Sequence, residues 1–232
     1  MNRLVFLKLA ITILLFNTAV SVTMGAEGKW TKGLYVKRPL QNGPQREITK
    51  GVLIVADPRL VDPNFSKTVV LVTHDGPGGT IGVIINRPTT TPLSRLLPDI
   101  KELKDRPDTL YIGGPVFYEV LVVLLRTQVH LESTDQVFDD VYFGHDMKTL
   151  TGMLKENSPK SAFRVYAGYA GWAPGQLQAE FDRGDWRIIR ADSGAVFEQD
   201  TETVWPEMIG RSSEQLIKDL SKPSRPRYAQ TP

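Results

Sequence analysis

The residue best placed to bind a ligand is Arg87, which follows the apolar run 82–85 and stands directly before a proline. A guanidinium keeps its charge and presents five donors in a fixed geometry, so it can bind a carboxylate or a phosphate with two parallel bonds. The end of a buried strand is also where open sheets place ligands. The alternative is a structural bridge from Arg87 to Asp62 or Asp57, with the neighbouring Asn86 bonded to loop backbone. Both roles stay open at this point.

His74 is the histidine with the best opportunity for acid–base chemistry, because it directly follows the apolar run 68–73. An imidazole can serve as a general base or a ligand near neutral pH. A small hydrolase or transferase would need His74 to meet Asn86, Arg87 and an acid such as Asp62 in three dimensions. The sequence has no Gly-x-Ser-x-Gly elbow, no P-loop and no residue spacing typical of a metal site. We therefore expect no metal and no cofactor, and favour a role without catalysis.

Two turn-forming segments carry further candidate binding residues. Asn64 and Phe65 close the run Asp-Pro-Asn-Phe, in which Asp and Asn can bond local backbone and proline makes the turn rigid. Asn64 would hold a ligand or a neighbouring loop and Phe65 would cap an apolar pocket, or the segment is a plain turn with Phe65 in the core. Gly113 and Gly114 would form a nest of backbone N–H groups that receives an anion, or a sharp bend between strands.

The segment 168–177 packs three glycines, a proline and two large aromatic residues into ten positions. Glycine permits positive φ and proline fixes φ, so we expect a rigid corner rather than ordinary helix or strand. Tyr169 and Trp172 would line a pocket or a protein-binding patch, or they would wedge the corner against the sheet. Gln176 then leads the chain into a helix.

These segments together resemble the YqgE/AlgH family, on the residues of 62–65, 82–88, 113–116 and 168–177. The resemblance covers roughly residues 51–210. It implies one α+β domain whose bent, mixed or antiparallel sheet approaches a barrel, with helices packed around it. It names a fold rather than a defined activity. The family's annotation as a transcriptional regulator is a third hypothesis, but the sequence offers no helix-turn-helix pattern for it.

The pattern of apolar residues predicts the same fold class. Continuous apolar runs indicate strands buried on both faces, and the cluster 75–79 is typical of a hairpin turn between two of them. Strands outnumber helices and do not alternate strictly with them, which favours α+β. The expected strands cover residues 51–56, 68–73, 82–85, 110–112, 120–125, 141–143, 163–167 and 186–190, with a last short strand or turn at 196–197. The expected helices cover residues 93–103, 146–156 (with Asp146 as N-cap), 176–183 and 204–209, with one further helical turn at 216–220.

The first 25 residues read as a signal peptide. Arg3 and Lys8 supply a positive start, residues 9–16 are mostly apolar, and small residues follow. We expect export with cleavage, hence a periplasmic or secreted protein; the alternative is an inner-membrane anchor formed by an uncleaved leader. Relatives in the family usually begin near Gly51 without a leader, which implies cytosolic residence for them. We divide the rest of the chain into an extended arm or linker (26–50), the α+β domain (51–212) and a polar, disordered tail (213–232).

Composition narrows the partners. The chain has no cysteine, which removes disulfides and thiolate chemistry, and its 28 basic and 26 acidic residues leave little net charge. Nucleic-acid binding needs a clustered basic face, so we do not expect it. We predict a non-enzymatic binding or regulatory module in the cell envelope, with a cleft built from loops. Its partner would be a small anionic ligand or an envelope protein, and it would contact a membrane only through an uncleaved leader.

Overall fold

Three neighbouring strands of the sheet bury apolar side chains on both faces. The computed structural model describes residues 48–128, 131, 134–145, 147–155 and 163–221, with residues 215–221 described as backbone only. In β1 (Val52–Ala56), β2 (Val69–Gly76) and β3 (Gly79–Ile84), alternate residues enter two different hydrophobic clusters. This confirms the burial on both faces that the continuous apolar runs predict.

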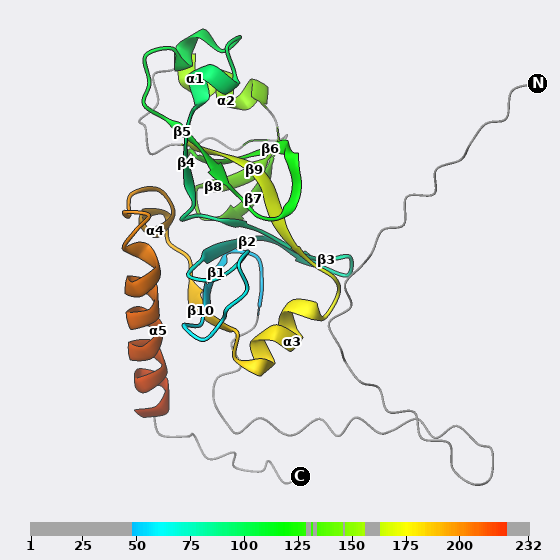
Figure 1. Cartoon of the computed structure of the whole chain (residues 1–232), viewed down its shortest axis with the longest axis vertical. Helices are drawn as coiled ribbons and strands as arrows, with labels where there is room; N and C mark the ends of the chain where they lie inside the picture. Colours follow the sequence, from blue (N-terminus) through cyan, green and yellow to red (C-terminus); the bar gives the residue numbers. More distant parts are fainter. Residues whose placement is uncertain (1–47, 129–130, 132–133, 146, 156–162, 222–232) are drawn as a thin grey trace, which may run out of the picture. The chain divides into compact units, whose positions relative to one another are not determined.

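The described residues form one ten-stranded sheet, in which the order β10-β1-β2-β3-β9-β6-β8-β7 is antiparallel throughout (Figure 1). β2 and β3 form the expected hairpin, and β5 pairs with β9 in parallel. The α+β fold class is therefore confirmed. The sheet is open rather than closed into a barrel, because β10 and β7 are its two ends. The remaining strands are β4 (Pro88–Pro92), β5 (Thr109–Ile112), β6 (Val116–Arg126), β7 (Asp135–Phe138), β8 (Val141–Gly144), β9 (Phe163–Trp172) and β10 (Trp186–Arg190).

Helices cover three separate hydrophobic clusters. The first cluster lies between one face of β1–β3 and the helices α4 and α5; the second lies on the opposite face, under α3. The third lies where α1, η1 and α2 pack on β6, β8 and β9 (Figure 1). These helices are α1 (Leu93–Leu96), η1 (Lys101–Leu103), α2 (Met147–Lys155), α3 (Gln176–Arg183), α4 (Ser193–Phe197) and α5 (Val204–Ser221).

The glycine-rich corner differs from the sequence expectation. Residues 168–172 are ordinary strand, the last part of β9, so the prediction that no part of 168–177 forms a strand is wrong. Gly168 has φ +66°, and just past it the strand passes from its β6 partner at Tyr169 to β3 at 170–172. Glycine is needed here for the positive φ and not to end the strand. The turn itself is confined to 173–175, ahead of α3.

One expected helix and one expected short strand or turn also differ. The helix expected over 93–103 is two short pieces, α1 and η1, because Pro98 between them lacks an N–H donor. Residues 196–197 belong to helix α4 and not to a strand; the Asp192 carboxylate caps α4 by accepting from the Ala195 N–H at 2.8 Å. The apolar pair 196–197 alone does not show that a helix begins at the Asp192 cap.

The described residues extend a short way past both ends of the expected domain, residues 51–212. Ile48, in the arm expected over 26–50, is buried in the second cluster. α5 continues to Ser221, past residue 212, so the start of the expected tail is helical. The leader, most of the arm, the Asp146 cap and residues 222–232 lie outside the described residues. Among the described helices, none combines the length and apolar composition that crossing a bilayer requires.

Candidate functional site

Arg87 is bonded to the loop 62–66 and not to a carboxylate. Its Nη1 donates to the Asn64 carbonyl at 2.6 Å, and Nη2 donates to the carbonyls of Pro63 at 3.3 Å and Ser66 at 3.4 Å. Burial lowers the pKa of Arg87, and the nearby Tyr118 and Asp62 oppose that shift. The guanidinium therefore shapes this loop through backbone carbonyls, and its described hydrogen bonds do not include the bridge to Asp62 or Asp57 considered for it.

Asn86 also connects strand ends. Its side-chain oxygen accepts from the Val69 N–H at 2.9 Å, and its nitrogen donates to the Lys67 carbonyl at 3.0 Å. The amide thus replaces ladder bonds where the chain enters β2. Both of its polar atoms have backbone partners, so Asn86 positions the 62–67 loop.

The two glycines of the Gly113–Gly114 bend allow backbone to approach β9. A Cβ atom at Gly113 would stand 2.2 Å from the Gly168 carbonyl oxygen, and one at Gly114 would stand 2.2 Å from Tyr169 backbone. The Gly113 N–H donates to the Ala167 carbonyl at 2.9 Å, so it is not available to an anion. The bend between strands therefore leaves room for β9, and a nest at this position would lack the Gly113 donor.

Trp172 is wedged into the core. It is 4% exposed, stacks on Phe65 with ring centroids 5.6 Å apart, and meets Trp186 edge to face. Its indole N–H donates to Glu180 of α3 at 2.9 Å. The same carboxylate accepts from the Trp186 indole at 2.9 Å and from the Gln176 amide at 3.0 Å. Phe65, Trp172 and Gln176 are thus parts of one structural cluster.

An open groove of about 420 Å³ lies beside the β2–β3 hairpin, and we call it the hairpin groove. It brings three of the candidate residues together: His74, Tyr169 and Trp172. Neither Asn86, Arg87 nor Asn64 lines it, so the constellation required for a hydrolase or transferase does not meet there. No group of His, Asp and Glu side chains within the described residues is arranged to hold a metal ion. The groove is lined by His74, Gly78, Gly79, Thr80, Ile81, Val116, Tyr169, Gly171 and Trp172.

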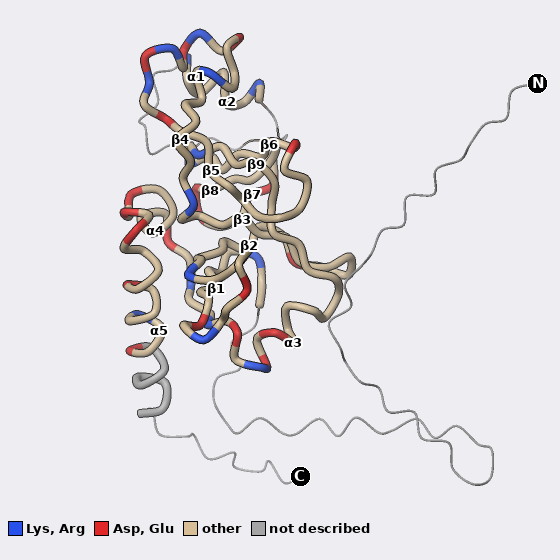
Figure 2. Tube along the Cα trace, viewed as in Figure 1, with Lys and Arg blue, Asp and Glu red and all other residues tan. Residues whose placement is uncertain are grey.

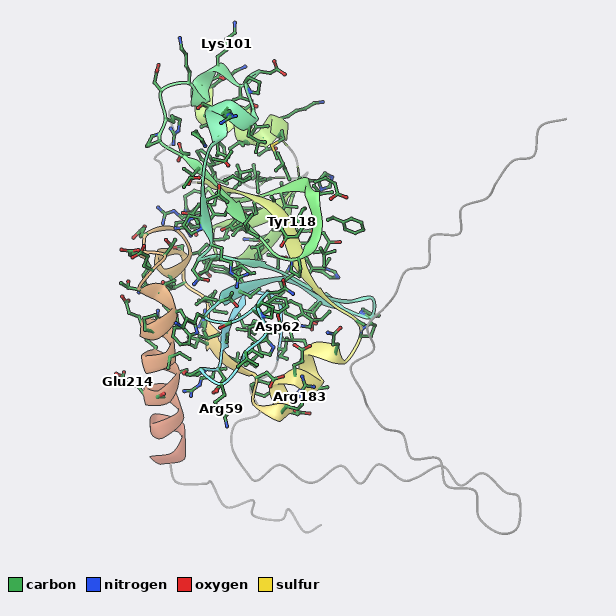
Figure 3. The ribbon with its side chains drawn as sticks, viewed as in Figure 1. Arg59, Asp62, Lys101, Tyr118, Arg183 and Glu214 are labelled. Atoms are coloured by element: carbon green, nitrogen blue, oxygen red, sulfur yellow. The ribbon has the colours of Figure 1, made fainter. Side chains whose placement is uncertain are left out.

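Next to the groove, β6 bows away from β9 (Figure 1). Val116 pairs with Tyr169 and Leu121 with Ala167, so five steps along β6 match two along β9. The four residues between them, Phe117, Tyr118, Glu119 and Val120, are all exposed, and we call them the aromatic bulge (Figure 3, where Tyr118 is labelled).

The aromatic bulge exposes large apolar side chains in a strained backbone. Phe117 is 57% exposed, Tyr118 53% and Val120 40%. Phe117 has φ +49°, a left-handed conformation that residues other than glycine rarely adopt. The Phe117 ring meets the Tyr169 ring at 6.0 Å, which joins the bulge to the groove. Residues held in strained backbone conformations cluster at functional sites.

Sequence reasoning missed the bulge, because it assigned Val120 to a central strand and did not consider Phe117 or Tyr118. A signal was present: two adjacent aromatic residues and an acid directly follow Gly-Gly-Pro-Val. Adjacent residues of a regular strand face opposite sides, so one of the two aromatics had to leave the core or the strand had to be irregular.

Comparisons with known proteins identify the family. The AlgH-like family model matches residues 53–216. A UPF0301 protein of Chlorobaculum tepidum is 32% identical over 182 residues, which cover 78% of this chain and 96% of the relative. Another, from Mycobacteroides abscessus, is 31% identical over 171 residues, with 72% and 82% covered.

Solved structures share the fold. The solution structure of the AlgH protein from Pseudomonas aeruginosa matches with a TM-score of 0.59 at 25% identity, covering 81% of this chain and all of that one. The crystal structure of a Corynebacterium diphtheriae protein matches with a TM-score of 0.61 at 26% identity, covering 71% and 87%. Family model, relatives and fold agree, and the chain belongs to the AlgH-like family.

Proposed function

We propose that this AlgH-like protein is a non-enzymatic module that binds another protein through the aromatic bulge and the adjoining hairpin groove. The observation that carries the proposal is the strained, exposed Phe117 beside Tyr118. Exposed tyrosine and phenylalanine are enriched where proteins bind one another. A soluble domain gains nothing in stability by holding such a ring in water at positive φ.

The state of the polar candidates favours a protein partner over a small anion. The donors expected to receive an anion, on Arg87 and Gly113, bond backbone carbonyls instead. The groove lining contains no Lys or Arg, and His74 is its one basic side chain. Charged residues of both signs are interspersed along the described elements (Figure 2), which supports neither a nucleic-acid surface nor an anion trap.

The partner would be an envelope protein if the leader directs export, as we propose from Arg3, Lys8 and the apolar run 9–16. A periplasmic or secreted location follows from cleavage, and an inner-membrane anchor follows from an uncleaved leader. Neither the hydrolase or transferase reading nor the regulator reading gains a specific observation among the described residues.

Photocrosslinking in living cells tests the binding role. A photoreactive phenylalanine analogue replaces Tyr118 in one strain and Leu96, an exposed residue of α1, in a matched control strain. We expect one specific adduct from position 118, absent from position 96 and lost when Phe117→Ser is added. The purified partner should then bind the wild type at least about tenfold more tightly than Phe117→Ser. Equal adducts from both positions, or none from position 118, would refute the proposal.

A further inference from the structure

We infer that the partner binds as an extended segment that pairs with the backbone of the aromatic bulge, adding a strand to β6, and that it carries a Lys or Arg opposite Glu119. This inference rests on the proposed protein-binding function and specifies its mode. Addition of a strand to an open sheet edge obtains affinity from main-chain hydrogen bonds and specificity from alternate side chains.

The backbone of the bulge is an open edge. β6 pairs with β8 only through residues 123–126, and its residues 117–120 have no Cα partner on β9. All four side chains are exposed, and no other described strand pairs with this part of β6. A strand edge with unpaired N–H and C=O groups is a template for another chain.

The side chains of the bulge differ from those that protect an edge against association. Natural edges are shielded by charged side chains, especially lysine, by proline, by inward-pointing charge or by a bulge that twists the edge away. Here the bulge presents Phe117, Tyr118 and Val120, with the single acid Glu119 among them. The apolar groups would gain contact area against a paired strand, while the bulge limits pairing to a short length.

Charge selects the occupant. Cross-strand pairs of opposite charge stabilise a sheet and pairs of like charge destabilise it. A second copy of this chain on the same edge would bring two Glu119 carboxylates into one short pairing. An anionic lipid surface would likewise be repelled by Glu119. A partner strand with apolar residues and one cation opposite Glu119 would cover the exposed apolar side chains of the bulge and pair with the Glu119 carboxylate.

A random peptide library displayed on phage provides the probe. It is selected on the purified protein, and enriched peptides are synthesised and titrated against the wild type, a Phe117→Ser/Tyr118→Ser variant and the control Leu96→Ser. We expect peptides with alternating apolar residues and a Lys or Arg, which bind the wild type and Leu96→Ser equally and the double variant at least about tenfold more weakly.

Two changes then test the mode of binding. N-methylation of alternate peptide nitrogens, which removes a donor and keeps every side chain, should weaken binding about threefold to tenfold at each ladder position. Glu119→Lys should weaken the binding of the cationic peptides. A peptide with Glu in place of its Lys or Arg should restore binding to that variant.

Each contrary outcome has a definite meaning. Peptides that need Phe117 and Tyr118 but tolerate N-methylation throughout would overturn strand addition and leave the proposed function intact. Selection that yields no peptide dependent on the bulge would overturn the inference, while the crosslinking result still decides the function separately. Dependence of phosphatidylglycerol vesicle binding on Phe117, without peptide binding, would assign the bulge to a lipid surface and overturn both proposals.

Discussion

At the scale of single residues, the chemistry of a side chain does not by itself show whether that side chain is available to a ligand or partner. By its chemistry Arg87 is the strongest ligand-binding candidate, yet its side chain donates hydrogen bonds to three carbonyls of the 62–66 loop. Phe117 has no group that binds an ion or moves a proton, yet its backbone is strained and its ring is exposed. Binding potential therefore lies less in the donors a residue has than in those that the fold leaves unused.

Arg87→Ala should lower the free energy of unfolding by about 1–3 kcal/mol, because loop carbonyls lose charged donors. The free energy of unfolding of Arg87→Lys should lie between those of the wild type and Arg87→Ala, since an ammonium cannot reproduce the planar guanidinium. Denaturant titration measures the change, with the exposed Arg183→Ala as a control expected to stay within about 0.5 kcal/mol. Thermal shift with a panel of carboxylates and phosphates completes the test: an anion that stabilises the wild type but not Arg87→Ala would restore the ligand-binding role.

The free energy of unfolding of Phe117→Asn should equal that of the wild type or exceed it by up to about 1 kcal/mol. Asparagine tolerates the left-handed conformation at φ +49°, whereas phenylalanine is strained in it, and the ring contact with Tyr169 offsets part of the gain. The same variant should lose partner binding. A loss of more than about 1 kcal/mol of stability would instead make the ring a part of the core.

At the scale of elements, the glycine-rich end of β9 is held to α3 by aromatic and carboxylate contacts. Trp172→Ala should lower the unfolding free energy by about 3–5 kcal/mol, because it empties a buried indole site between Phe65 and Trp186. Trp172→Phe keeps most of the burial and removes the bond to Glu180, so it should cost less. A change below about 1 kcal/mol for the alanine variant in denaturant titration would favour a recognition role for Trp172.

A second set of contacts connects α5 to the sheet. The buried Asp57 carboxylate accepts from Arg59 at 2.8 Å and from Arg187 at 3.3 Å, and Arg187 reaches Ser212 and Ser213 of α5. The hydrogen bond from Arg59 lowers the pKa of Asp57, burial opposes it, and Arg187 lowers it further.

Because the folded-state pKa of Asp57 is depressed, its stabilising contribution is present above the ordinary aspartate pKa and disappears as the pH falls through the folded value. Asp57→Asn should therefore reduce the loss of stability on acidification below about pH 4. Unfolding titrations at a series of pH values measure it, with the exposed Asp182→Asn as the control. An acid dependence identical to that of the wild type would show that Asp57 contributes nothing to it.

At the scale of the whole molecule, sequence patterns predicted what repeats along the chain and missed what depends on distant segments. The apolar runs of β1–β3 predict buried strands because burial on both faces leaves a continuous signature. The transfer of β9 from β6 to β3 near Gly168 and the bow of β6 are set by register between strands far apart in sequence. Of the candidate residues, the hairpin groove brings together His74, Tyr169 and Trp172, and tertiary hydrogen bonds occupy the donors of Asn86 and Arg87 elsewhere.

The chain also extends beyond the family match, which begins at residue 53. We predict that export removes the first segment, because Arg3 and Lys8 precede a short apolar run at 9–16 and small residues follow. N-terminal sequencing of protein from separated cell fractions should find a start between residues 20 and 28, outside the cytosol.

A pair of matched substitutions makes this prediction specific. Leu14→Arg places a charge in the apolar run that the export machinery must accept, so the variant should stay in the cytosol with Met1 intact. Leu34→Arg introduces the same charge beyond the expected cleavage site and should be processed like the wild type. Intact Met1 on cytosolic wild-type protein would refute export. An uncleaved wild-type chain in the membrane fraction, released by truncation at residue 26, would identify the leader as an anchor, and the aromatic bulge would then meet its partner at the membrane face and not in free solution.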